Sequence, residues 1–529
     1  MRRHIFFIAV VFIGILLPGF SIQRLVPAEQ GEKFGFADPT GKMIIPASYD
    51  QVKEFSEGLA PVLKNYKEYK WSFINETGQE VIFPQYDYAE PFSHGLALIC
   101  VNGAYNFIYP KGKIAFMDWF EEAWSFESPL ALVKYQGKYR FVNTRGAYAM
   151  NEKFEETENF SENFAAVKVR GRWGYIDRRG TFVVKPQYDM AFPFDNGLAA
   201  VQSGEFFGYI DTAGKFIVDP KLENPLDFFE DMAIFEEEGK KGFVNRKARI
   251  LIPARYDDAS DFSEGFARIK NSGRYGYIDK EGNAITPVEF EDGSDFSEGL
   301  ATVKKDGKWG FIDNRGKQVI PFTLEAAAGF SEGLAPFREN GRWGFMDKKG
   351  TRVIPASFDY ASPFQHGVAR IQLNRKFGLI NAKGKVLLEP HFEKISLFND
   401  GQAKVEIEKR TGLIDTSGRI LIPVQYSSVD FFSEGRAKVQ SNGKWGFVSR
   451  NGELVIPCKY DMASGFSEAY AAVKENGKWG YINREGVQVI PCVYYDAKPF
   501  RRGKGEVTVD IRNNIAYVRA IDRSGKFVR

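Results

Sequence analysis

The stretch Gly329–Gly333 reads GFSEG and matches the G-x-S-x-G pattern around the nucleophilic serine of α/β-hydrolases. That chemistry needs a sharp strand-to-helix turn at Ser331 and a histidine with an acid to take its proton. The chain repeats Phe-Ser-Glu-Gly at Phe55, Phe262, Phe296 and Phe432. Since a stretch copied into several places is expected to be structural, we predict that Ser331 is not a nucleophile and that the chain is not an enzyme.

The four histidines are His4, His94, His366 and His391. His94 and His366 stand in the contexts FSHG and FQHG, where other copies have Glu. No two of the histidines have a zinc-ligand spacing such as H-x-x-x-H. His4 lies in the expected signal peptide at 1–22, and His391 is solitary. We therefore interpret His94 and His366 as surface turn residues and expect no metal and no cofactor.

Two columns of charged residues recur at a fixed spacing and could bind Ca²⁺ or anionic glycans. The carboxylates are Glu57, Glu162, Glu230, Glu264, Glu298, Glu332, Asp400, Glu434 and Glu468. The basic residues are Lys33, Lys70, Lys138, Arg172, Lys240, Arg274, Lys308, Arg342, Lys376, Arg410, Lys444 and Lys478. Calcium sites use several carboxylates within a few residues, and no D-x-D-x-D run occurs. The simpler interpretation is two solvated ladders of turn residues, with ion pairs worth less than about 1 kcal/mol each.

One constant period underlies both columns. A glycine, here named the index glycine, marks it at positions 174, 208, 242, 276, 310, 344, 378, 412, 446 and 480. Ser72, Asn106 and Arg140 occupy the same register upstream, and Gly35 follows after a slip of three positions. A Phe column runs in the same period from 92 through 500, with Phe55 ahead of it. The chain thus holds fourteen clear repeats, of which units two to four are degenerate, and a partial final unit.

Composition favours strands over the helices of other repeats with this period, because each unit is rich in Gly and carries a Pro. Leu300–Lys305, Trp309–Asp313 and Lys317–Ile320 read as three strands. Asp306-Gly307 is a pair that forms tight hairpins, and Pro321 ends the third strand. We therefore predict an all-β chain, a tandem array of about fifteen three-stranded antiparallel β-meander repeats.

One such unit cannot bury its own apolar face, so neighbouring units must stack. We expect the Phe column and the rings beside the index glycine to form the core between units, and that glycine to leave room for a neighbour's ring. The array is predicted to be an open superhelical or solenoid stack; closed β-propeller-like rings are the alternative. The structural repeat positions are Trp173, Gly174, Trp309, Gly310, Trp343, Gly344, Trp445, Gly446, Trp479, Gly480, Phe262, Phe296, Phe330, Phe432 and Phe466. The Trp column could instead be a stacking platform for sugars.

The motifs KWGFID at 308–313, RWGFMD at 342–347, KWGFVS at 444–449 and KWGYIN at 478–483 resemble the bacterial WG, or KWG, β-repeat family. The resemblance covers nearly the whole chain after residue 22. It implies an all-β bacterial repeat array, and it implies no shared activity and no catalytic residues.

The N-terminus has Arg2 and Arg3 before an apolar run from Ile5 to Leu17, which is the layout of a secretory signal peptide. We therefore expect a signal peptide at 1–22, with an uncleaved anchor as the alternative, and the repeat array at 23–529. The three cysteines, Cys100, Cys458 and Cys492, are too few for a disulfide framework. Cys458 and Cys492 hold the same repeat position, and we favour free thiols for both.

The net charge of +3 and the even spread of Lys and Arg argue against a nucleic-acid-binding protein. The sequence favours a non-enzymatic exported scaffold that binds a protein or polysaccharide at the bacterial cell envelope, with no transmembrane segment after the signal peptide. The alternatives are a carbohydrate-active or other enzyme on propeller-like rings, and a purely structural envelope protein. The expected location is periplasmic, on the outer surface, or secreted. The sequence does not identify the ligand or the oligomeric state.

Overall fold

The computed structural model of the chain describes residues 25–31, 33–64, 70–247, 249–512 and 515–528. Every helix or strand in these ranges is a β-strand, which confirms the predicted all-β tandem array. Within them, no helix has the length and apolar character needed to cross a membrane. The predicted signal peptide at 1–22 lies outside the described residues. By its contacts, the chain divides into two compact units, Met1–Gln85 and Tyr86–Arg529.

The first unit begins with a three-stranded sheet of β1 (Val26–Gln30), β2 (Lys33–Ala37) and β3 (Met43–Tyr49). The next sheet has the order β4 (Gln51–Val52), β5 (Leu59–Leu63), β6 (Trp71–Asn75) and β7 (Glu80–Tyr86). The core between these two sheets includes Phe36 and Ile45 from the first sheet and Val62 and Ile74 from the second, all of them buried.

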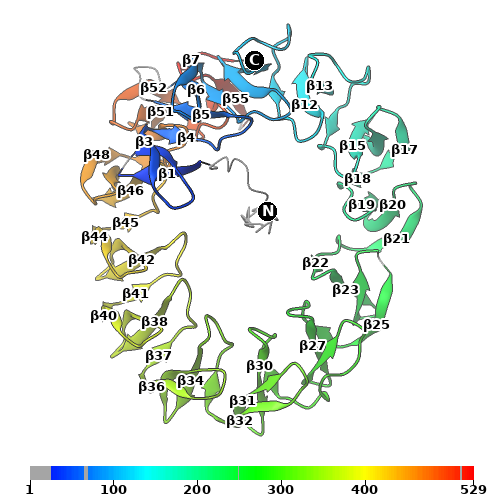
Figure 1. The fold of residues 1–529 in the computed structure, drawn as a ribbon, viewed down its shortest axis with the longest axis vertical. Helices are drawn as coiled ribbons and strands as arrows, with labels where there is room; N and C mark the ends of the chain where they lie inside the picture. The colour runs from blue at the N-terminus through cyan, green and yellow to red at the C-terminus, as the bar shows by residue number, and fades with distance from the viewer. Residues whose placement is uncertain (1–24, 32, 65–69, 248, 513–514, 529) are drawn as a thin grey trace, which may run out of the picture. The chain divides into compact units, whose positions relative to one another are not determined.

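The second unit repeats one small antiparallel sheet along its length (Figure 1). Each sheet opens with a two-residue strand: β8 Tyr88–Ala89, β11 Glu122–Ala123, β14 Glu156–Thr157, β18 Met190–Ala191, β22 Phe228–Phe229, β26 Asp258–Ala259, β29 Asp292–Gly293, β33 Ala326–Ala327, β37 Tyr360–Ala361, β41 Lys394–Ile395, β45 Ser428–Val429, β49 Met462–Ala463 and β53 Asp496–Ala497. The first long strands follow: β9 Ala97–Val101, β12 Leu130–Tyr135, β15 Phe164–Val169, β19 Leu198–Ser203, β23 Met232–Glu237, β27 Phe266–Asn271, β30 Leu300–Lys305, β34 Ala335–Glu339, β38 Val368–Leu373, β42 Gln402–Ile407, β46 Arg436–Ser441, β50 Tyr470–Glu475 and β54 Gly505–Arg512.

The second long strands carry the index position: β10 Ala104–Ile108, β13 Lys138–Asn143, β16 Arg172–Asp177, β20 Phe206–Asp211, β24 Lys240–Asn245, β28 Arg274–Asp279, β31 Lys308–Asp313, β35 Arg342–Met346, β39 Lys376–Asn381, β43 Arg410–Asp415, β47 Lys444–Ser449, β51 Lys478–Asn483 and β55 Ile515–Ile521. Nine sheets add a third long strand: β17 Phe182–Tyr188, β21 Phe216–Leu222, β25 Ile250–Tyr256, β32 Gln318–Leu324, β36 Arg352–Phe358, β40 Val386–Phe392, β44 Ile420–Tyr426, β48 Leu454–Tyr460 and β52 Gln488–Tyr494.

The sheet β29-β30-β31-β32 shows how the sequence specifies each element. Asp306 and Gly307 both have positive φ, 50° and 75°, as a two-residue type I′ hairpin requires. The Oδ1 atom of Asp313 accepts the N–H groups of Arg315 and Lys317 and so holds the next turn. The three predicted long strands are present, and the segment that returns to the next Phe adds the short fourth strand. The prediction that Pro321 ends the third strand is wrong, because β32 runs on to Leu324; the register shift between β31 and β32 leaves Pro321 without a paired residue.

The index glycine faces the backbone of the third strand in its own sheet. A Cβ at Gly174 would lie 2.5 Å from the carbonyl oxygen of Val184, and one at Gly344 would lie 2.5 Å from that of Ile354. The register between the second and third strands shifts at this place, which brings the two backbones close together. The expectation that the glycine leaves room for a neighbour's ring is therefore wrong for these positions.

Where the index position is Asn106, the third long strand is absent and the side chain takes over its contacts. The Asn106 amide donates to the carbonyl oxygens of Phe116 and Asp118, each at 3.0 Å, and its oxygen accepts from Phe116 N–H at 3.3 Å. These side-chain bonds add to the backbone bonds between Tyr105 and Phe120 that remain at this place.

The Phe column packs between successive sheets. The rings of Phe311 on β31 and Phe330 in the next sheet have centroids 5.1 Å apart, and those of Phe345 and Phe364 are 4.8 Å apart. Phe262, Phe296, Phe330 and Phe466 are buried, and Phe432 is half-buried. The aromatic rings therefore form a continuous series of small cores rather than one large one.

The first and last sheets of the second unit contact each other. The Tyr105 hydroxyl donates to the carbonyl oxygen of Arg502 at 2.6 Å, and the Arg502 guanidinium donates to the carbonyl oxygen of Ala123. The Lys504 ammonium donates to the carbonyl oxygen of Glu121 at 2.5 Å and lies 4.8 Å from the centroid of the Tyr105 ring. Burial lowers the pKa of Lys504, as expected of an ammonium group inside such a contact.

Candidate binding site

The Phe-Ser-Glu-Gly turns connect each sheet to the next. The Ser331 hydroxyl donates to the carbonyl oxygen of Phe364 in the following sheet at 2.7 Å. The same bond joins Ser93 to Phe126, Ser161 to Phe194, Ser263 to Phe296, Ser297 to Phe330, Ser433 to Phe466 and Ser467 to Phe500. The serine of the G-x-S-x-G match therefore has a structural partner in the adjacent sheet.

The carboxylate column accepts backbone N–H groups from the adjacent sheet. Glu264 accepts from Glu298 N at 2.6 Å and from Gly299 N at 2.7 Å. One or two bonds of this kind are made by Glu162, Glu230, Glu264, Glu298, Glu332, Glu434 and Glu468. These side chains are occupied by the fold, and no group of three or more His, Cys, Asp or Glu in the described ranges could hold a metal ion.

Several of these carboxylates also meet a cation from the next sheet. Lys280 lies 3.2 Å from Glu230, and Lys348 lies 3.1 Å from Glu298. Desolvation raises the pKa of Glu230, but the N–H of Gly265 and the Lys280 ammonium outweigh it, so the pKa is lowered. Desolvation is likewise outweighed at Glu298, whose pKa the Lys348 ammonium holds below its ordinary value.

The basic column pairs with the acid that follows the third strand of the same sheet. Lys33 pairs with Asp50 at 2.7 Å and Lys444 with Asp461 at 2.5 Å. Asp461 also accepts from the hairpin N–H of Gly477. Ion pairs of this kind are also made by Arg172, Lys240, Arg342 and Lys376.

The junction between the sheet β18-β19-β20-β21 and the sheet β22-β23-β24-β25 departs from this pattern. Asp195 and Asn196 replace the Ser and Glu of the usual turn. Arg246 connects the two sheets instead, since its guanidinium lies 2.5 Å from Asp195 and 2.5 Å from Asp231. The two sheets are thus joined by exposed charges, which hold less firmly than the backbone bonds elsewhere.

The segment that returns to β22 is also irregular. Its Asn224 and Pro225 align with Met190 and Ala191, which form the short strand β18 in the preceding sheet. No short strand forms at 224–225. The N–H of Leu226 instead donates to the Tyr209 hydroxyl at 2.8 Å, so the segment lies against the preceding sheet.

The edge of β23 consequently has no strand beside it at Ile234 and Glu236. The matching residues of β30 are Thr302, whose N–H donates to Ser294 Oγ, and Lys304, whose carbonyl accepts from Glu291 N. At β23 the described residues supply no such partner, because β22 pairs only with Ala233 and Met232. Backbone N–H and C=O groups therefore face an open space.

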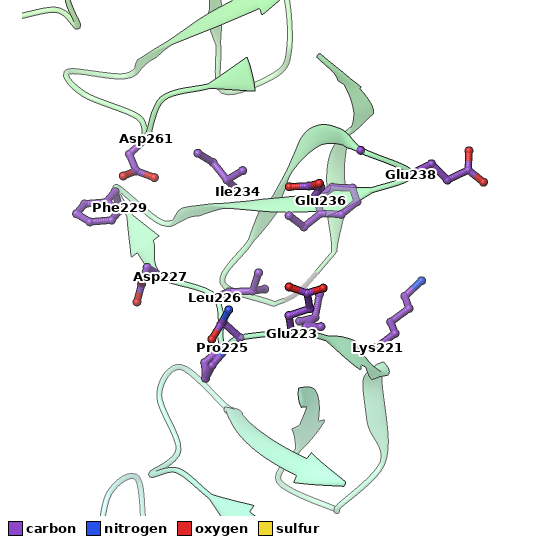
Figure 2. A pocket seen from close by; sticks show the side chains of 14 residues that line it. Lys221, Glu223, Pro225, Leu226, Asp227, Phe229, Ile234, Glu236, Glu238 and Asp261 are labelled. Atoms are coloured by element: carbon purple, nitrogen blue, oxygen red, sulfur yellow. The ribbon is translucent and has the colours of Figure 1, made fainter. Parts of the chain in front are cut away.

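That space is a cavity of about 670 Å³. In Figure 2, Pro225 and Leu226 lie on one side of it, and Ile234 and Glu236 lie across from them on β23. A second cavity of about 190 Å³ lies on the other side of the same segment and shares Pro225 and Leu226 as lining residues. The return segment thus runs between two cavities and is packed loosely.

The larger cavity is acidic. Its lining includes five carboxylates and one lysine, namely Glu223, Asp227, Glu236, Glu238, Asp261 and Lys221. Desolvation raises the pKa of Asp261, and the charges of Asp227 and Asp295 raise it further. The site therefore combines an unpaired strand edge with a negative potential that favours a cation.

The other residues singled out in the sequence lie elsewhere. Trp173, Trp309, Trp343, Trp445 and Trp479 are half-buried, and none of them lines the larger cavity. His94 and His366 sit in turns with φ of 55° and 56°. Cys458 and Cys492 are free thiols that donate to the carbonyl oxygens of Val439 and Val473.

Sequence reasoning missed this junction, although it left a signal. Elsewhere the return segment often begins Tyr-Asp, but here it reads LENP from Leu222 to Pro225, and the Ser-Glu of the preceding turn is Asp-Asn. These two changes from the repeat pattern lie on either side of one junction, and they mark the place where the cavity forms.

Solved structures resemble this chain only weakly. No curated protein matches the chain. The solved structures with similarity include the extracellular domain of a protein described as a hybrid two-component system of B. thetaiotaomicron (10% identity, 86% of this chain and 79% of that one, TM-score 0.20). They also include a eukaryotic initiation factor (11%, 63% and 96%, 0.27) and PorZ of the Porphyromonas gingivalis type-IX secretion system (9%, 85% and 83%, 0.20). TM-scores this low say nothing about what the chain binds or does.

A family model described as the WG containing repeat matches far more specifically. It matches thirteen times, at residues 34–67, 71–105, 141–173, 173–205, 207–240, 242–275, 275–309, 309–343, 343–377, 377–410, 412–445, 445–479 and 479–510. These segments cover most of the chain and follow the period of the sheets. The chain belongs to the WG-containing repeat family.

Proposed function

We propose that this chain is a non-enzymatic, exported repeat scaffold that binds a protein partner at the bacterial cell envelope. The observation that carries the proposal is the difference between the regular junctions and the junction at 223–239. The recurring Ser, Glu and Phe side chains are used in contacts between sheets, whereas the junction at 223–239 leaves an acidic cavity beside a bare strand edge. A recognition role at that junction is consistent with a regular array that supports it.

The chemistry of the cavity favours a protein over a polysaccharide. Its carboxylates would repel the acidic glycans of an envelope, and its lining has Phe229 and Phe235 as the only aromatic side chains. The half-buried Trp rings are packed against the small cores, as Trp173 and Trp445 are, and so are poorly placed as sugar platforms. Sugar binding is the second candidate, because these rings are only partly buried.

Export is supported by the Arg2-Arg3 and apolar run at the N-terminus. The test is to express the full chain in a bacterium, separate the periplasm and medium from the cytoplasm, and weigh the exported chain by mass spectrometry. A product outside the cytoplasm that lacks the segment 1–22 supports the proposal. A full-length chain that stays in the cytoplasm contradicts it.

A further inference from the structure

We propose that β23 is a docking edge for an extended, lysine- or arginine-bearing segment of a partner protein, which adds a strand beside Ile234 and Glu236. The inference rests on the proposed function and deepens it, since it names the chemistry of the partner and the way it binds.

The backbone of β23 supplies the bonds. An antiparallel sheet edge offers N–H and C=O groups from alternate residues, and these groups are satisfied by whatever strand lies next to them. In the sheet of β30 the return segment fills this place: Ser294 N donates to the carbonyl of Thr302 at 2.8 Å, and Glu291 N donates to that of Lys304 at 2.9 Å. At β23 the matching groups of Ile234 and Glu236 face the cavity.

The open edge suits an added strand, because the segment that should cover it is held away. Leu226 N is bonded to the Tyr209 hydroxyl, and the Tyr209 hydroxyl also lies 3.4 Å from the Leu226 carbonyl. The donor that bonds Thr302 in the sheet of β30 is Ser294 N, which aligns with Leu226, so the bond from Leu226 N to the Tyr209 hydroxyl takes away the matching donor at β23. A partner strand would therefore not have to displace an existing one.

The charges select the partner's side chains. Glu223 and Asp227 lie on the return segment, Glu236 and Glu238 on or just after β23, and Asp261 on the following sheet. A strand placed between these walls presents alternate side chains to opposite sides, and cationic ones would meet carboxylates on both. A strand with acidic side chains would be repelled.

The test uses a short synthetic peptide of alternating valine and lysine, capped at both ends and fluorescently labelled. We expect it to bind the full chain in a fluorescence anisotropy titration, with affinity that falls as salt is raised. Two control peptides separate the contribution of charge from that of backbone hydrogen bonds. The first has glutamate in place of lysine, and the second has methylated backbone nitrogens at alternate residues. Both are expected to bind at least ten-fold more weakly.

The matched variant is the double substitution Asn224→Met and Pro225→Ala, which copies the Met190–Ala191 pair of the preceding sheet. It should restore the short strand, cover the edge and weaken peptide binding at least ten-fold. Equal binding by the variant, equal binding of the methylated peptide, or no binding to the wild-type chain would each overturn the proposal. If circular dichroism shows that the variant fails to fold, the methylated peptide on the wild-type chain decides.

A second copy of the chain is the competing occupant. Sedimentation velocity of the wild type and the double variant distinguishes it: a wild-type dimer that the variant loses would assign the edge to self-association and overturn the peptide proposal. Failure of peptide binding would leave export and partner binding elsewhere on the array intact, so the two proposals fail separately.

Discussion

The carboxylate of Glu264 accepts the backbone N–H of Glu298 at 2.6 Å, and the two residues are 34 positions apart, at the same place in successive sheets. Glu298 in turn accepts the N–H of Gly333 in the following sheet. Each turn therefore donates its N–H groups to the preceding sheet and accepts N–H groups from the following one. This series of Glu-to-backbone bonds, here named the glutamate ladder, recurs along the array and explains why Phe-Ser-Glu-Gly recurs in the sequence.

Removing one step of the ladder should loosen one junction. Glu264→Gln loses the charge and one of the two acceptor oxygens. We expect the local free energy of opening to fall by about 1 kcal/mol, because hydrogen bonds to charged groups are strong but this one is weakened by exposure to water. The loss is measured as faster hydrogen exchange of the peptide containing Glu298 and Gly299. Glu281→Gln, at an exposed turn residue outside the ladder, is the control and should leave that exchange unchanged.

Acid should weaken the ladder. The pKa values of Glu230 and Glu298 are lowered in the folded chain, so their contribution is present above the unfolded pKa near about 4.3 and is lost as the pH falls through the folded value. Lys348→Met removes the ammonium beside Glu298 and should move the acid transition to higher pH, as followed by circular dichroism. Lys383→Met, at an exposed lysine elsewhere, should not move it.

The index glycine should tolerate no side chain. A Cβ at Gly344 would lie 2.5 Å from the Ile354 carbonyl oxygen and 2.6 Å from the Ala356 nitrogen, so Gly344→Ala must push two strands apart. We expect a loss of about 1–3 kcal/mol or more, measured by urea unfolding. Gly329→Ala is the matched control, because its only neighbour within 4 Å is the Ser297 side chain at 3.9 Å.

Ser331 should be chemically inert. Its hydroxyl is bonded to the Phe364 carbonyl, and we expect no labelling by a fluorophosphonate, the reagent that modifies activated serines. Ser331→Ala should be destabilised by about 1 kcal/mol, through the loss of one hydrogen bond. Labelling of Ser331 in the wild type would contradict the non-enzymatic proposal.

The contact between the first and last sheets of the second unit can be trapped covalently. A Cβ at Gly503 would lie 3.4 Å from Cys100 Cβ, near the separation of a disulfide. Gly503→Cys should therefore form a bridge to Cys100, which lowers the free thiols from four to two. Burial raises the pKa of Cys100 to about 12, so an oxidation catalyst is needed. Gly435→Cys shares the left-handed turn position, has nothing within 4 Å, and should keep four free thiols.

Much of the fold could be predicted because its signals are local. Asp306-Gly307 specifies a hairpin and Asp313 the next turn within one unit, and repetition multiplies the evidence for both. The partners of the ladder could not be predicted, since Glu264 and Glu298 meet only through the stacking of sheets. The contact of Tyr105 with Arg502 joins residues 397 positions apart, and no single unit encodes it.

The candidate site was the least predictable part. Asn224 and Pro225 look like ordinary sequence variation within one unit when the columns are averaged. Their effect becomes clear only beside β23, where the missing strand leaves Ile234 and Glu236 facing a cavity.

The most direct test of the account is hydrogen exchange, by mass spectrometry, of the peptides covering β23 and β30 in the full chain. With no strand beside it, the amide of Ile234 should exchange much faster than that of Thr302, which is bonded to Ser294 Oγ at 3.1 Å. The valine–lysine peptide should then slow the exchange of β23 and leave β30 unchanged. Equal, slow exchange of the two strands in the free chain would show that the β23 edge is already covered and would contradict the account.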